Sequence, residues 1–259
     1  MDRQNFLDKV LAYGKQEGFA ECEVFYRGGK AFEVLIMEGE VSNYENCREE
    51  GLAFRGNIGG RTGYAYTERL TEEAIPYLVE TAKENASLLS PEDMEDLYEG
   101  EETYPELEGV NEELEQLAVS EKIAAAMKME QAALAGAEEV ASLDYCALGT
   151  ALAEIAIKNT KGLDVSFAKN FATAYVSAIA RKGDETKTGV YFWKAQNWND
   201  FDPEKTGREA AKRAASHLGA ASVASGKYDV ILDGRAMVSL LGAFAGISLQ
   251  KVRRRASPC

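Results

Sequence analysis

Histidine is almost absent from this sequence: His217 is the only one among 259 residues. Zinc peptidases commonly hold their metal with two histidines from one short helical motif, in which a neighbouring glutamate activates water. No HExxH-type pair exists here. Histidine-based zinc peptidase chemistry is therefore excluded for this chain acting alone.

Cysteines are few, and neither a long apolar run nor a signal peptide is present. The four cysteines, Cys22, Cys47, Cys146 and Cys259, form no CxxC pair, so the sequence indicates neither a zinc knuckle nor a redox motif. The opening MDRQNFLDKV is charged and amphipathic rather than secretory. No apolar run approaches the ~20 residues that cross a bilayer. Together these absences predict a reduced, cytoplasmic location.

Positive charge is in the minority. Lysine and arginine number 29 against 43 aspartates and glutamates, which gives a net charge of −14. Such a surface repels phosphate backbones and anionic lipid, so binding of nucleic acid or membrane through charge is disfavoured. The hydrophobic content of 46% can supply a core, and the length allows one large domain or two ordinary ones.

Residues 1–90 have the pattern of an N-terminal helix-and-sheet domain. Apolar residues at helical spacing predict a helix over about residues 2–17. Thr71 is the expected N-cap of a second helix that ends near Leu89, although Pro76 lies deep in it for a proline. Between the helices, alternating or β-branched segments predict strands at residues 20–26, 32–37, 41–47, 52–54 and 62–66.

Residues 91–118 are dense in glutamate and aspartate. A charge run of this kind is typical of solvated chain, so we expect an acidic linker at a domain boundary. A binding surface for a basic partner is the alternative interpretation.

Residues 119–225 are predicted to form a central α+β region. Ser120 is the expected N-cap of a helix through about Ala135, and Asp202-Pro203 is a typical helix start, with aspartate as cap and proline at the first position. The inward side of the first of these helices should consist of Ile123, Ala126, Met127 and Leu134. Strands are expected at residues 151–158, 164–170, 173–181 and 189–194.

Residues 226–259 are expected to begin a third part of the molecule. They contain a predicted buried strand, residues 228–232, and a strongly apolar helix, residues 237–244, that should lie in a core. The apolar periodicity then stops, and Lys251, Arg253, Arg254 and Arg255 follow. This basic tail is either a contact for nucleic acid or an acidic surface, or the product of an early stop or altered frame, which we favour. The fold class as a whole is predicted to be α+β.

Three further features have competing interpretations. The glycine-rich stretch of residues 56–63 has the composition of a phosphate cradle but matches no phosphate-binding motif and lies between predicted strands, which favours a turn. His217 lies on an alanine-rich helix and is interpreted as structural, with a pairing to Cys22, Cys47 or Cys146 left open. The aromatic segment at residues 191–198, YFWKAQNW, suits either a core, which we favour, or an interface.

Several sequence blocks, in this order and spacing, resemble the TldD/PmbA family, also described as modulators of DNA gyrase. The blocks are residues 20–24 (AECEV), 38–41 (EGEV), 51–55 (GLAFR), 63–67 (GYAYT), 158–163 (KNTKGL), 207–221 (GREAAKRAASHLGAA) and 226–233 (GKYDVILD).

In catalytic, TldD-like members, the apolar helix after the last block carries HExxxH, whose histidines bind zinc and whose glutamate polarises water. Here Gly242 and Ile247 stand at the histidine positions and Ala243 at the glutamate position. The resemblance therefore implies the non-catalytic TldE/PmbA branch, with no catalytic, metal or cofactor residue in this chain. Zinc is expected in a TldD-like partner instead.

The resemblance also implies a function and a longer chain. Family members continue through a β-rich C-terminal domain, so we expect this sequence to be truncated at its C-terminus. The implied role is that of a partner subunit in a cytoplasmic zinc peptidase complex, or a self-associated form of it. Its substrates would be unfolded peptides such as leader peptides and labile antitoxins, held by strand addition. The alternatives are a stand-alone binding or regulatory protein and, less favoured, an enzyme that uses cysteine.

Overall fold

The computed structural model describes residues 3–90 and 96–246. The chain divides into two compact units, residues 1–219 and 220–259. Unit 1 contains α1 (Arg3–Gln16), β1 (Glu21–Met37), β2 (Glu40–Ile58), β3 (Arg61–Thr67), α2 (Ala74–Ser87), α3 (Glu112–Glu115), α4 (Val119–Leu134), β4 (Val140–Asn159), β5 (Asp164–Lys182), β6 (Glu185–Ala195) and α5 (Pro203–Ser216), with a 3-10 turn at Trp198–Asp200. Unit 2 contains α6 (Gly234–Ala245). The predicted α+β class is confirmed.

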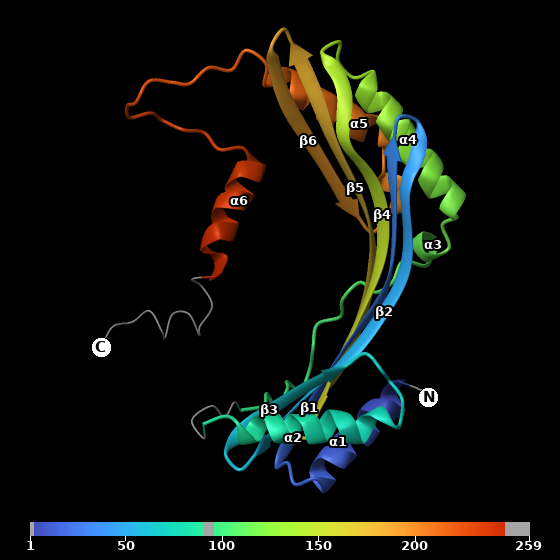
Figure 1. The fold of residues 1–259 in the computed structure, drawn as a ribbon, viewed down its shortest axis with the longest axis vertical. Helices are drawn as coiled ribbons and strands as arrows, with labels where there is room; N and C mark the ends of the chain where they lie inside the picture. Colours follow the sequence, from blue (N-terminus) through green and yellow to red (C-terminus); the bar gives the residue numbers. More distant parts are fainter. Residues whose placement is uncertain (1–2, 91–95, 247–259) are drawn as a thin grey trace. The chain divides into compact units, whose positions relative to one another are not determined.

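One antiparallel sheet organises unit 1, with strand order β3-β2-β1-β4-β5-β6. Four of its strands are 17 to 20 residues long, whereas strands of ~3–10 residues are usual. The long strands bend strongly along their length (Figure 1). Because β1 pairs with β2 on one side and β4 on the other, strands from residues 1–90 and 119–225 join the same sheet.

The sequence patterns underestimated these strands. Residues 20–26 and 32–37 belong to the single strand β1, and residues 41–47 and 52–54 both belong to β2. The interruptions are glycines that the packing requires. A Cβ on Gly29 would lie 2.1 Å from the carbonyl oxygen of Leu152, and one on Gly28 would lie 2.2 Å from the Tyr26 hydroxyl. These glycines permit close approach within a continuous strand.

Helices cover one face of the sheet at two places. At one end, α1 and α2 pack on even-numbered residues of β1 and β2 and form the first core. Towards the other end, α4 and α5 pack on even-numbered residues of β1, β4 and β5 and form the second core. Alternate strand residues point to opposite faces, so the odd-numbered residues of β1, β4 and β5 lie on the opposite face, here called the open face.

The helix starts were only partly predicted. Asp202 caps α5 as expected, accepting a hydrogen bond from the Lys205 backbone N–H, with Pro203 at the first position. In contrast, α2 begins at Ala74 after Glu73, so Thr71 is not its cap and Pro76 falls within the first turn, where proline is tolerated. The fourth helix begins one residue before Ser120, after an Ala118 that makes no side-chain cap. Its predicted inward residue Leu134 is 41% exposed.

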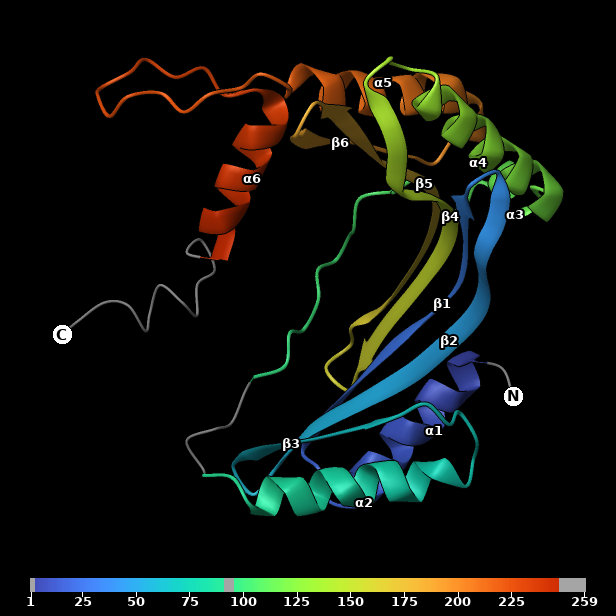
Figure 2. The ribbon, with the colours of Figure 1, turned by 45° about the horizontal axis from the view of Figure 1, so that its top comes forward.

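The acidic segment before α4 is not wholly solvated. Leu97 and Leu114 are buried at 3% and 2% exposure, and α3 lies within the segment, capped by Asn111. The Asn111 N–H donates to Oδ1 of Asn170 on β5, and its carbonyl accepts from Nδ2 of the same side chain. Figure 2 shows residues 96–111 running up to α3 as extended chain. Apolar anchors and an amide clamp therefore hold both ends of a segment that charge alone suggested was a free linker.

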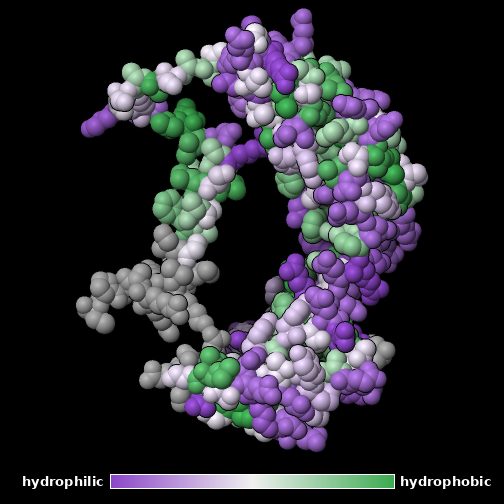
Figure 3. Space-filling model, viewed as in Figure 1, coloured by the Kyte–Doolittle hydropathy of each residue, from purple (hydrophilic) through white to green (hydrophobic). Residues whose placement is uncertain are grey.

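Unit 2 differs most from expectation. Residues 228–232 form no strand and Ile231 is 98% exposed. A strand needs a hydrogen-bonded neighbour, and none is present among residues 220–246. The apolar helix does form as α6, capped by Asp233. Its predicted burial in a core is wrong for the described residues: Val238, Leu241 and Phe244 are 71%, 61% and 57% exposed. In Figure 3, α6 is largely green.

Among the helices of the described residues, none is long and apolar enough to cross a bilayer.

Candidate functional site

The zinc-motif positions lie on or just beyond α6. Gly242 and Ala243 are in the helix, while Ile247 lies outside the described residues. The helix carries no histidine, cysteine or carboxylate. Across residues 3–90 and 96–246, no group of three or more histidine, cysteine or acidic side chains is arranged to hold a metal ion. The basic tail from Lys251 to Arg255 and Cys259 also lie outside the described part.

The glycine-rich stretch is the β2–β3 hairpin. Gly59 and Gly60 form its turn with φ of 57° and 74°, a backbone region that glycine enters without strain. Gly63 pairs with Gly56 and lies against α2, where a Cβ would stand 2.1 Å from the Ala82 carbonyl oxygen. These glycines serve a turn and a helix contact, so the turn interpretation is confirmed.

His217 has a structural partner. It follows the last turn of α5, and its Nδ1 lies 2.9 Å from the carbonyl oxygen of Thr188 on β6. A carbonyl accepts, so this contact places the ring proton on Nδ1. The structural interpretation of His217 is confirmed.

Two of the three cysteines described by the structure are buried and unsuited to nucleophilic chemistry. Cys22 lies in the first core and Cys146 in the second, and burial raises the pKa of each thiol to about 12. A thiol is nucleophilic as the thiolate, which such burial suppresses. Cys47 is exposed on β2.

The aromatic segment divides between the two faces of the sheet. Three of the aromatic residues pack against the second core: Tyr191, Trp193 and Trp198. The ring centroids of Trp193 and Phe201 are 4.5 Å apart. Phe192 points the other way and is 47% exposed. The core interpretation therefore holds for three of the four aromatic residues.

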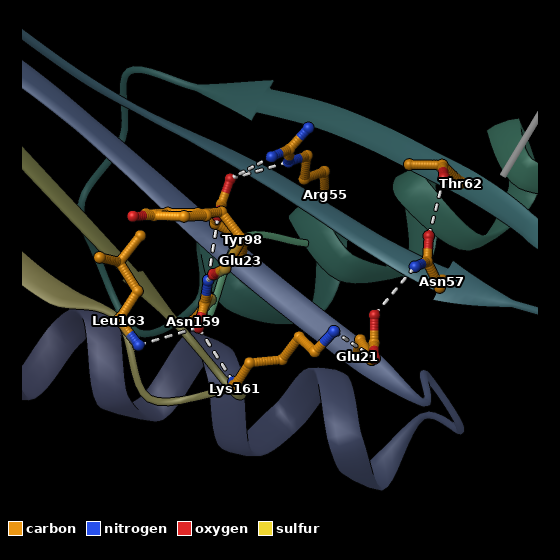
Figure 4. Close-up of polar contacts among 9 residues, drawn as sticks. All are labelled: Glu21, Glu23, Arg55, Asn57, Thr62, Tyr98, Asn159, Lys161 and Leu163. Atoms are coloured by element: carbon orange, nitrogen blue, oxygen red, sulfur yellow. Dashed lines mark hydrogen bonds and ion pairs between the residues drawn. The ribbon is translucent and has the colours of Figure 1, made fainter. Parts of the chain in front are cut away.

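A polar cluster that the sequence did not reveal lies at one end of the open face (Figure 4). The Arg55 guanidinium donates from Nε at 2.8 Å to the Glu23 carboxylate, and its Nη2 pairs with it at 2.7 Å. Asn159 Nδ2 donates to the other Glu23 oxygen at 3.2 Å and to the Tyr98 carbonyl at 2.7 Å. Nearby, Glu21 accepts from Asn57 and pairs with Lys161.

The cluster joins residues that are far apart in the sequence. Glu23 and Asn159 are 136 positions apart but directly opposite in the β1–β4 register. Asn159 also accepts from the backbone N–H groups of Lys161 and Leu163, which shapes the β4–β5 turn. Each buried charge has a partner, as burial requires. This cluster therefore holds together three of the sequence blocks, residues 20–24, 51–55 and 158–163, and its role is structural.

Part of the remaining open face is apolar. Four of its large side chains are 36% to 47% exposed: Phe25, Ile155, Tyr175 and Phe192. Small residues occupy the neighbouring positions of β1 and β4, namely Gly29, Ala31, Ala147, Gly149, Ala151 and Ala153. Exposed apolar side chains grouped on one surface indicate a binding site more often than single ones do. The open face is thus the candidate binding surface.

Comparison with protein families agrees with these observations. The family model "PmbA/TldA metallopeptidase domain 1" matches residues 22–86, and "PmbA/TldA metallopeptidase central domain" matches residues 112–218. Together the matches cover more than half of the chain. A comparison with curated proteins gives no match.

Solved structures give the same result. A protein from Thermotoga maritima described as a modulator of DNA gyrase has a TM-score of 0.86 at 27% identity, over 99% of this chain and 58% of its own. TldE from Thermococcus kodakarensis has a TM-score of 0.72 at 21% identity, over 81% of this chain and 47% of its own. A Bacteroides thetaiotaomicron protein, also described as a modulator of DNA gyrase, has a TM-score of 0.77 at 18% identity, over 87% of this chain and 52% of its own.

The chain therefore spans about half the length of these solved proteins. Their likeness supports the same fold, and the two family matches establish the relationship. By these matches, the chain belongs to the TldD/PmbA family.

Proposed function

We propose that this chain is a non-catalytic, TldE/PmbA-like subunit that holds unfolded peptide for a zinc peptidase whose metal site lies on a TldD-like partner chain. The observation that carries the proposal is the chemistry of α6. Both matching family models are described as metallopeptidase domains, yet the helix that resembles the family's zinc helix has Gly242 and Ala243 at two motif positions. Neither side chain has an atom that can bind a metal or accept a proton.

The open face supports the peptide-binding part of this proposal. An unfolded peptide presents apolar side chains and an unpaired backbone, and it needs a surface that offers apolar contact without a narrow pocket. Phe25, Ile155, Tyr175 and Phe192 provide such contact, and the small residues between them let a peptide backbone approach the sheet closely. Leader peptides and labile antitoxins are suitable substrate classes.

The test is reconstitution with a TldD-like chain that carries HExxxH. The present chain alone should hold no stoichiometric zinc and should not cleave unfolded casein or a leader peptide, whereas the mixture should cleave both. The matched control is a partner in which the first motif histidine is replaced by alanine, which should abolish cleavage by the mixture. Chelator-insensitive cleavage by this chain alone, or about one tightly bound zinc per chain by elemental analysis, would contradict the proposal.

A further inference from the structure

The free strand edges of unit 1 differ in how well they are protected from pairing with another chain. An unpaired edge presents a row of backbone N–H and C=O groups that can pair with another chain, and proteins usually cover or distort it. On β6, the Val190 carbonyl accepts a hydrogen bond from Arg213 of α5, and the Thr188 carbonyl accepts one from His217, which follows α5. This edge is therefore covered by a helix.

The other short edges are also covered or distorted. On β3, the Tyr64 carbonyl accepts from Asn85 of α2 at 2.9 Å. The part of β5 that β6 does not reach is flanked by the acidic segment, through the Asn111–Asn170 contacts. The part of β4 that β1 does not reach has two register shifts near its start, and such bulges discourage pairing.

The edge of β2 has no such protection. The third strand pairs with β2 only from Leu52 onwards, which leaves residues 40–51 paired to β1 alone. All residues from Glu40 to Glu50 are exposed. Among the described residues, no side chain from another element bonds the backbone of this stretch. It contains neither proline nor lysine, and its charged side chains are Glu40, Glu45, Arg48, Glu49 and Glu50. Its length is roughly 40 Å at strand spacing, and Figure 2 shows β2 along the margin of the sheet.

The charge of this edge selects its partner. Glu45 and Glu49 lie on the open face beside Cys47, and Glu33 of β1 stands directly opposite Glu45. Like charges opposite one another are destabilising. In the described part of the chain, Glu33, Glu45 and Glu49 have no ion pair. Burial and the charges of Glu33 and Glu45 also raise the pKa of Tyr145, so the carboxylates gather around one phenol. A cation supplied along this edge would relieve the repulsion.

We infer that residues 40–51 of β2 are a strand-addition site for an extended peptide with lysine or arginine at alternate positions. The peptide backbone pairs with the free edge, and its basic side chains meet Glu45 and Glu49 on the open face. A second copy of this chain fits less well, because antiparallel self-pairing would bring two acidic edges together. The inference rests on the proposed function only in taking unfolded peptide as the ligand.

Cys47 permits a direct test, because it lies in the middle of the edge and is exposed. The chain is prepared with Cys259→Ser, and the probe is a short peptide of alternating lysine and threonine with one cysteine moved along it position by position. In an added strand, alternate side chains share a face. With oxidised glutathione as the oxidant, disulfide formation with Cys47 should therefore rise and fall with a period of two along the peptide. Uniform cross-linking at all positions would overturn the inference.

Charge is tested separately by binding of the cysteine-free peptide. Glu45→Lys with Glu49→Lys should weaken binding of the lysine peptide by roughly tenfold and strengthen binding of a matched glutamate peptide. Glu121→Lys, an exposed acid on α4, is the control and should leave both affinities nearly unchanged. Equal effects of the control would overturn the role of the edge charges. A Cys47-linked dimer that forms to the same extent with and without excess peptide would show that a second copy occupies the edge. Neither assay uses a partner chain or proteolysis, so failure here is separable from failure of the proposed peptidase role.

Discussion

The two cores lie on the same face of one sheet but are built differently. The first core uses large side chains: Phe6, Leu7, Phe19, Phe54 and Leu78 are each at most 3% exposed. The second core is rich in alanine, and its fully or almost fully buried members include Ala126, Ala133, Ala174, Ala178, Ala180, Ala210 and Ala214. One core therefore gains stability mainly from apolar area per residue, the other from the close approach of backbones.

The difference follows from how closely the helices approach the neighbouring helices and strands in each core. In the second core, a Cβ on Gly207 of α5 would lie 2.2 Å from the Met129 carbonyl oxygen on α4, and one on Gly189 of β6 would lie 2.0 Å from the Ala214 backbone nitrogen. The helices and strands nearly touch there through their main chains. The first core has such an approach too, between Gly63 of β3 and the Ala82 carbonyl oxygen of α2. Its helix α1, in contrast, meets side chains, because a Cβ on Gly14 would lie 2.9 Å from side-chain atoms of Cys22 and Phe54. Large side chains fill that space, and they can adjust.

The largest effect should come from emptying the first core. Phe54→Ala removes a fully buried ring that packs edge-on against Phe19, with the two ring centroids 5.1 Å apart. The expected loss in free energy of unfolding is about 3–5 kcal/mol, measured by denaturant titration. Val176→Ala in the second core is the matched deletion and should cost less, because it removes two methyl groups instead of a ring. Equal losses would show that the two cores do not differ in this respect.

Adding a methyl group, instead of removing one, should destabilise mainly the second core. Gly207→Ala adds one methyl group against the backbone of α4 and should destabilise by about 1–3 kcal/mol. Gly14→Ala is the matched control, because the same substitution in α1 meets side chains that can move and gains the same helix propensity. We therefore expect a smaller loss, or a gain, in its thermal midpoint. If Gly14→Ala is the more damaging, the backbone-contact account of the second core is wrong.

The sequence predicted what local chemistry determines. The cap at Asp202-Pro203, the glycine turn at the tip of β2–β3 and the apolar periodicity of α1 are each set within a few residues, and each is present in the structure. The α+β class and the family followed from many such signals in the right order.

Long-range contacts were not predictable in the same way. The predicted strands stop short of Gly28, Gly29 and Gly51, where the atoms that exclude a Cβ come from side chains and strands placed by the fold. The pairing of Glu23 with Asn159 depends on a register that no local pattern encodes. The exposed part of β2 lacks apolar alternation because neither helix layer covers it, so its strand character depends on pairing with β1. The candidate binding surface could therefore be identified only from the assembled sheet.

The smallest expected effect uses the buried thiol in each core. Burial raises the pKa of both Cys22 and Cys146 to about 12, whereas an unfolded thiol has a pKa of ~8.5. Below ~8.5 both states keep the proton and nothing changes. As the pH rises above that value, only the unfolded state releases it, so stability falls, and by pH 9 the loss is about 1 kcal/mol per thiol.

Cys22→Ala and Cys146→Ala should each remove the same share of this loss between pH 7 and 9, because the two thiols are shifted alike. Cys47→Ala, which removes an exposed thiol outside both cores, is the control for the substitution itself. The measurement is urea unfolding at several pH values, with each variant compared to its own value at pH 7. If only Cys146→Ala flattens the slope, water reaches the first core, and its large side chains pack less tightly than their burial indicates. If both do so equally, the two cores are equally dry despite their different construction, and the contrast between them lies in packing distance alone.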